Sequence, residues 1–76
     1  MRYVKSVLYA GYPLGETHLK LHLEQGGRIL PAIGFGMADR VVETGAALDV
    51  LYSPMTSEWS GMTTVELRLL DFRPHD

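Results

Sequence analysis

The segment His18–Glu24 alternates strictly between polar residues and leucines, and this alternation constrains the fold more than any other part of the sequence. A period of two predicts a half-buried β-strand, with the leucines on the buried face. Gly26-Gly27 follows almost at once. Two glycines favour a type I′ hairpin turn, because both central residues of that turn need positive φ. The sequence therefore predicts a β-hairpin centred on this glycine pair.

The register of this hairpin follows from the position of the two glycines. It pairs Leu23 with Leu30, Leu21 with Ala32 and Leu19 with Gly34, and these residues form one inward face. The opposite face is mixed rather than polar, and it holds His18, Lys20, His22, Ile29, Ile33 and Phe35. We expect such a mixed outer face where a sheet curls into a barrel, or where a partner covers it.

Further segments complete the predicted order of elements. Strands are predicted over Arg2–Ala10, Ala46–Pro54 and Thr63–Phe72, and Gly11–Thr17 is predicted as a loop. Met37–Gly45 is the one plausible helix, and its last residue is a natural C-cap. Five short strands, with a helix between the third and fourth, is the order of the OB fold. An SH3-like barrel is the structural alternative, but it usually lacks a full helical turn there. We therefore expect residues 1–76 to form a single all-β, OB-fold-like barrel.

Composition excludes several kinds of site. The absence of cysteine excludes disulfides, thiolate metal sites and cysteine nucleophiles, and it fits a reducing compartment, so we expect a cytoplasmic protein. No apolar run approaches the ~20 residues that a membrane span needs, and the first residues do not resemble a signal peptide. The formal net charge of −2 is unlike that of a free-standing, high-affinity nucleic-acid binder, which is usually basic. A weak binding face remains compatible with it.

Motifs for catalysis or metal binding are not found. His18 and His22 lie four strand residues apart, which separates them by roughly 13 Å and prevents them from sharing a metal ion. The serines occur in no nucleophile motif, and "IGFGMA" has neither a following "GK[ST]" nor the "GxGxxG" spacing. We therefore predict no catalytic residue, no metal ligand and no cofactor in this chain.

Binding of single-stranded nucleic acid is the function that the predicted fold favours. OB folds hold such strands on their second and third strands and on two flanking loops, with aromatic rings for bases and cations for phosphates. The candidate residues on these elements are His18, Lys20, His22, Arg28, Phe35 and Trp59, together with Tyr12 in the first loop. Phe35 could instead pack the helix against the barrel. Trp59, predicted in the last turn, could stack on a ligand or pack on the barrel.

Several motifs also occur in the order found in one known family. They are "HLKL" at 18–21, the Gly26-Gly27 turn, "AIGFGM" at 32–37, "LDV" at 48–50, "SEWSG" at 57–61 and "VELRLLDFRP" at 65–74. Over His18–Pro74 the sequence resembles the OB-fold domain near the C-terminus of bacterial RecJ, the single-strand-specific DNA exonuclease. Ser57 stands where that family often has asparagine, and Glu66 where it often has glutamine.

The resemblance implies that this chain is one domain of a larger 5′-to-3′ exonuclease of DNA repair and recombination. The catalytic domains of that enzyme would bind manganese or magnesium, and no "DHH" triplet of their kind occurs here. The domain would hold single-stranded DNA, with the candidate cations on phosphates and the aromatic rings on bases. Two alternatives remain, namely a structural domain that contacts other domains or a protein partner, and a small hydrolase, which has little support.

Overall fold

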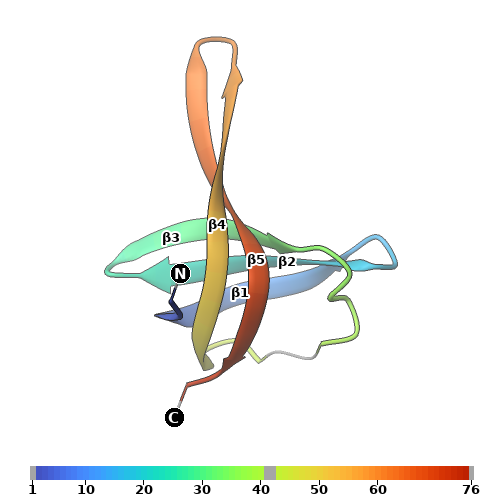
Figure 1. Ribbon diagram of the computed structural model, residues 1–76. Helices are drawn as coiled ribbons and strands as arrows, with labels where there is room; N and C mark the ends of the chain where they lie inside the picture. Colours follow the sequence, from blue (N-terminus) through green and yellow to red (C-terminus); the bar gives the residue numbers. More distant parts are fainter. Residues whose placement is uncertain (1, 41–42, 76) are drawn as a thin grey trace.

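Five β-strands form a closed barrel in the computed structural model, which describes residues 2–40 and 43–75. The strands are β1 (Val4–Leu14), β2 (His18–Gln25), β3 (Arg28–Gly34), β4 (Ala47–Trp59) and β5 (Met62–Pro74). They are arranged in the order β1-β2-β3-β5-β4, and β4 pairs with β1 to close the barrel (Figure 1). Neighbouring strands are antiparallel, except that β3 and β5 are parallel. The predicted fold class, an OB-fold-like barrel, is confirmed.

The β2–β3 hairpin has the register that the sequence predicts. The pairs are Leu19 with Gly34, Leu21 with Ala32 and Leu23 with Leu30. Gly26 and Gly27 have φ angles of 56° and 82°, the left-handed values that a type I′ turn requires. One face of the hairpin consequently enters the core, and the other forms part of the barrel surface.

The core consists of the inward residues of all five strands. Its buried members are Leu8, Leu19, Leu21, Leu23, Ala32, Leu48, Val50, Leu67, Leu69 and Phe72. Ser6 is buried as well, and its Oγ accepts a hydrogen bond of 2.8 Å from Gln25 Nε2. This bond pairs a polar group that would otherwise destabilise the interior.

The predicted helix over Met37–Gly45 is wrong, since residues 2–40 and 43–75 contain no helix. Backbone groups of this segment bond to other parts of the barrel instead. Ala38 N–H donates to the Thr17 carbonyl at 3.1 Å, and Gly45 N–H donates to the Leu8 carbonyl at 2.7 Å. A helix of so few residues is costly to nucleate, and these longer-range bonds take its place.

The apolar periodicity behind the helix prediction rested on Met37, Val41 and Val42. Met37 is half-buried and packs against the core, where it lies directly over Gly34. Val41 and Val42 lie outside the described residues. The segment between β3 and β4 therefore contributes a core side chain without forming a helix.

Strand β1 is longer than predicted, because it continues through part of the predicted loop Gly11–Thr17. Tyr12 pairs with Lys20, and Leu14 pairs with His18. A bulge lies between Leu8 and Ala10. The long β2 partner offers hydrogen bonds to these residues, and this pairing prevails over the weak strand propensity of glycine and proline.

The two last strands extend well beyond the barrel, which is the largest difference from the prediction. Strand β4 passes Pro54 and continues to Trp59. Beyond Pro54 it pairs with β5 from Met55 with Glu66 to Trp59 with Met62, at the tip of the hairpin. β3 pairs with β5 only at positions nearer the barrel. Figure 1 shows this hairpin projecting from the barrel. We call residues 55–66 the arm.

The tip of the arm is a two-residue turn rather than the polar loop predicted around Trp59. Ser60 and Gly61 have φ angles of 50° and 76°, which again match a type I′ turn. Ser60 is the only described non-glycine residue with positive φ. The backbone of Trp59 ends β4 and pairs with Met62. Its side chain lies outside the described part of the structure.

Substitution of Leu21 by alanine tests the core. Leu21 is fully buried, so we expect the free energy of unfolding to fall by about 2–5 kcal/mol, through lost burial and the cavity left behind. Urea unfolding followed by circular dichroism measures this change. The control is Leu14→Ala on the exposed surface, which we expect to change stability far less. Equal effects of the two substitutions would contradict the placement of the core.

Substitution of Gly61 by valine tests the arm. A branched residue at φ 76° is strained by about 1–2 kcal/mol, so we expect amide hydrogen exchange in the arm to accelerate by roughly 5–30-fold. Exchange in β2 and β3 should stay unchanged. Thr63→Val is the matched control, because position 63 has no positive φ. Unchanged exchange at Thr63 and Thr64 in Gly61→Val would rule out the tight turn.

Candidate functional site

The outer face of β1, β2 and β3 brings several predicted site residues into neighbouring rows. Strand register places Tyr12, Lys20, Ile33 and Arg68 in one row across β1, β2, β3 and β5. Leu14 and His18 begin the adjacent row. The row on the other side holds Ala10, His22 and Pro31. The face is consequently a patchwork of rings, aliphatic side chains and cations.

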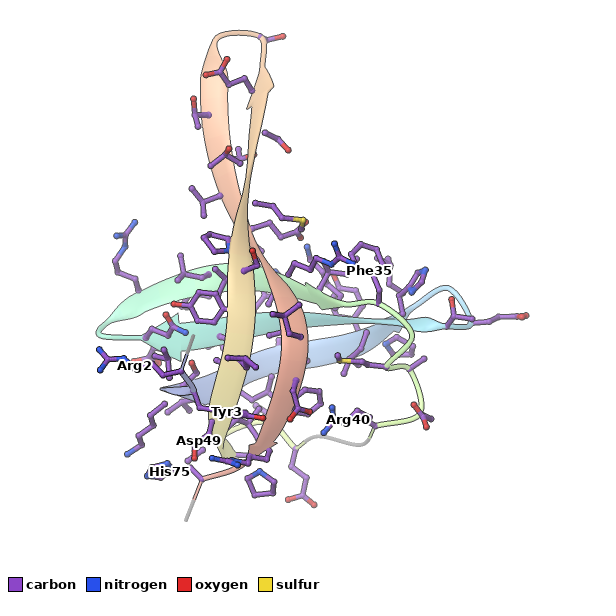
Figure 2. All side chains as sticks on the ribbon, viewed as in Figure 1. Arg2, Tyr3, Phe35, Arg40, Asp49 and His75 are labelled. Atoms are coloured by element: carbon purple, nitrogen blue, oxygen red, sulfur yellow. The ribbon has the colours of Figure 1, made fainter. Side chains whose placement is uncertain are left out.

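Phe35 is the most exposed ring in this part of the face. It follows the last residue of β3 and is 47% exposed. The His18 ring meets it edge-on, with centroids 5.1 Å apart, and the Arg68 guanidinium lies 5.4 Å from its centroid. The predicted alternative, that Phe35 packs a helix against the barrel, does not hold because that helix is not present in the described residues. Phe35, which Figure 2 labels, therefore offers a ring surface, and the Arg68 guanidinium lies beside it.

His18 is held by the backbone that follows Phe35. Gly36 N–H donates to His18 Nδ1 at 3.1 Å. The Nδ1 atom is then an acceptor, so a neutral His18 carries its proton on Nε2. The bond and the ring contact together fix the imidazole against Phe35.

His22 occupies a different environment on the same strand. Its ring stacks with Tyr12 at a centroid distance of 6.2 Å and an interplanar angle of 29°. Its Nδ1 atom is buried and has no hydrogen-bond partner among the described residues. His18 and His22 thus have separate neighbours, Phe35 and Tyr12.

Lys20 lies between the two histidines and forms an ion pair with Glu66 at the base of the arm. The two side chains are 19% and 34% exposed, so the pair is partly shielded from water. Burial lowers the pKa of Lys20, because it disfavours the charged form. Lys20, which the sequence predicts to contact a DNA phosphate, is consequently already paired with a carboxylate.

Arg28 and Trp59 are not brought to this cluster. Arg28 is exposed at the first residue of β3, whereas Phe35 follows the last residue of that strand. Seven steps along the strand separate the two by about 23 Å. Trp59 belongs to the tip of the arm, and its side chain is outside the described part.

Sequence reasoning missed the two β5 residues of the face, Glu66 and Arg68. Both residues alternate with Leu67 and Leu69 in the sequence, and this alternation indicates the outer side of the strand. Their neighbours are set by the parallel pairing of β3 with β5, in which Ile33 pairs with Arg68. The OB-fold strand order contains that pairing, and applying it would have found both residues.

A second polar cluster lies near the chain termini, at the other end of the barrel (Figure 2). Tyr3 Oη donates to Asp71 Oδ2 at 2.6 Å, and Arg40 Nη1 donates to Asp71 Oδ1 at 3.0 Å. The Arg40 guanidinium also lies 4.1 Å from the centroid of Phe72. The bond from Tyr3 and then that from Arg40 lower the pKa of Asp71. These contacts tie the segment after β3 to β5.

His75 and Arg73 extend this cluster toward Asp49 on β4. His75 Nδ1 lies 2.6 Å from Asp49 Oδ1, and Arg73 Nε lies 4.0 Å from Asp49 Oδ2. A cavity of about 460 Å³ opens beside Arg40 and Arg73. Both guanidinium groups already have carboxylate partners, so the cavity does not have the free cations of an anion site.

Metal coordination finds no support in residues 2–40 and 43–75, where no three histidine or acidic side chains are grouped closely enough to hold an ion. The same residues form no helix long and apolar enough to cross a membrane.

Comparison with known protein families gives one match. Residues 5–71 match the family model described as the RecJ OB domain. Searches of curated proteins and of solved structures gave no significant match. The matched range covers most of the chain, including all of β2 and β3.

Substitution of Asp71 by asparagine tests the second cluster. The folded-state pKa of Asp71 is below its ordinary value of 3.8, so its stabilising effect is present above that pH. It is lost as the pH falls through the folded-state pKa. Because the side chain is 42% exposed, we expect Asp71→Asn to cost less than about 1 kcal/mol at pH 7.

Thermal melting between pH 2 and pH 7 measures this effect. The difference between Asp71→Asn and the wild-type chain should shrink as the pH falls. Asp39→Asn is the control, because Asp39 is an exposed acid outside the cluster. A difference that is constant over the whole pH range would contradict the role of the ionised carboxylate.

Proposed function

Because the chain belongs to the RecJ OB-domain family, we propose that it is a nucleic-acid-binding accessory domain of a RecJ-like 5′-to-3′ exonuclease. In this proposal the outer face of β2 and β3 holds single-stranded DNA and guides it to a catalytic site outside this chain. An OB domain is a non-catalytic module, so hydrolysis would belong to other domains, with manganese or magnesium as their metal. The enzyme would act in the cytoplasm, in DNA repair and recombination.

The contact of Phe35 with His18 and Arg68 is the observation that carries this proposal. A half-exposed ring can stack on a base, and base–aromatic stacking contributes about 1–3 kcal/mol per base. The Arg68 guanidinium beside the ring can meet the adjoining phosphate. His18 contacts the ring edge-on and helps to fix it, so little order has to be gained when a base binds.

The charge of the chain limits how tightly it can bind. Its net charge is −2, and Lys20 and Arg40 already have acidic partners. Few cations are then available for phosphates, so binding by this domain should be weak and should fall steeply as salt increases. Such a domain would add to the affinity of a larger enzyme rather than bind DNA tightly by itself.

A structural role is the second candidate, and the arm is the observation that favours it. Met62 and Val65 are 66% and 45% exposed on the arm, and an isolated two-stranded hairpin is only marginally stable in water. Contact with a catalytic domain of the parent enzyme would cover these residues. The two roles use different surfaces, so substitutions can separate them.

Substitution of Phe35 by alanine tests the DNA-binding proposal. We expect the dissociation constant for a fluorescein-labelled oligothymidine to rise by about 5–150-fold, because one stacking contact is lost. Fluorescence anisotropy at low salt measures the change. Leu70→Ala is the matched control, since Leu70 is similarly exposed but lies in the β4–β5 bulge.

Two results would contradict the proposal. One is equal affinity of Phe35→Ala and wild type. The other is no detectable binding by any variant at high micromolar concentration, with circular dichroism showing an intact fold. Met62→Ala addresses the structural role in the intact parent enzyme. Loss of thermal stability there, with unchanged DNA affinity, would favour an interdomain surface.

A further inference from the structure

The ion pair between Lys20 and Glu66 occupies the middle of the proposed DNA-binding face. The two residues are 46 positions apart in the sequence and come from different strands, β2 and β5. Lys20 pairs with Ile33 in the strand register, and Ile33 pairs with Arg68. The ion pair is therefore adjacent to the cation that accompanies Phe35.

Glu66 reaches this position because of where it stands in β5. It directly precedes Leu67, which is buried and pairs with Ala32. Alternation along the strand then directs Glu66 to the outer face, at the point where the arm leaves the barrel. Both partners are partly shielded from water, so the attraction between them is screened less than that of a fully exposed pair.

A DNA phosphate and the Glu66 carboxylate would use the same donor. The Lys20 ammonium is a compact charge with three hydrogens, and it binds carboxylate and phosphate oxygens alike. Glu66 also places a negative charge within the path of a negatively charged strand. We propose that Glu66 competes with DNA phosphate for Lys20, and that this competition sets the affinity of the domain for single-stranded DNA. This inference rests on the proposed function.

This competition has two consequences for binding. A phosphate gains from Lys20 only the difference between its own contact and the contact of Glu66. Displacement of Glu66 also releases a contact between β2 and the base of the arm. Binding of a strand on β2 and the anchoring of the arm therefore oppose each other.

Glu66→Gln is the substitution that tests this inference, because it keeps the shape of the side chain and removes the charge. We expect the variant to bind oligothymidine about 5-fold more tightly, the equivalent of an ion pair near 1 kcal/mol. We also expect the slope of log affinity against log salt to steepen by about 0.7, the value for one further phosphate contact on a single strand. Thermal melting checks that the fold is retained.

Glu24→Gln is the matched control, since Glu24 lies on the outer face of β2 and pairs in register with Ile29, away from Lys20. It removes the same charge, so its effect on affinity measures the general electrostatic gain alone. Lys20→Gln is then made in the wild-type and Glu66→Gln backgrounds. Competition predicts that Lys20→Gln weakens binding by a factor about 5-fold larger in the Glu66→Gln background.

The possible outcomes separate this inference from the proposed function. Tighter binding by Glu66→Gln beyond that of Glu24→Gln, with the expected coupling to Lys20, supports both. Equal gains from the two glutamine substitutions, or equal costs of Lys20→Gln in both backgrounds, overturn the competition and leave DNA binding intact. Absence of DNA binding in every folded variant overturns the proposed function and the inference together.

Discussion

The parallel pairing of β3 with β5 is the contact on which the rest of the structure depends. It joins Ala32 to Leu67 and Ile33 to Arg68, and without it the five strands would form an open sheet with two free edges. Closure buries Leu67 against the β2–β3 hairpin and completes the core. The same register step places Arg68 beside Phe35 and Glu66 beside Lys20. One short pairing thus determines both the barrel interior and the chemistry of its outer face.

Local sequence patterns predicted the structure correctly where it depends on residues close in the chain. They failed where hydrogen bonds to distant segments determine the structure. The leucine alternation and the Gly26-Gly27 turn predicted the β2–β3 register residue by residue, because turn geometry and burial act on the same few positions. The ends of β1 and β4 were predicted too early in the sequence, because glycine and proline residues there indicate loops. In the structure, hydrogen bonds to long partner strands extend both strands past these residues. The helix over Met37–Gly45 failed because its backbone finds bonds to Thr17 and Leu8 elsewhere in the barrel.

The candidate site follows the same division. Alternation placed His18, Lys20 and Phe35 on the outer face, and their grouping there is what the structure has. The charged partners of Lys20 and Phe35 are Glu66 and Arg68 on β5, which are more than thirty positions away from them in the chain. A cation that looks available in the sequence can therefore be engaged in the fold. The mixed outer face does not form one basic surface. Its rings contact one another, and the Lys20 ammonium pairs with the Glu66 carboxylate.

The type I′ turn at Ser60-Gly61 restricts how the arm can differ in length between related sequences. In an antiparallel pair, hydrogen-bonded and non-hydrogen-bonded positions alternate, and a two-residue turn of this type closes on a hydrogen-bonded position. Removing or adding one residue in each strand would bring the wrong kind of pair to the turn. Length can then vary only in steps of two residues in each strand, or about 7 Å. The barrel core ends before the arm begins, so such steps would leave the barrel unchanged. They would alter only the distance between the barrel and the tip of the arm, in fixed increments.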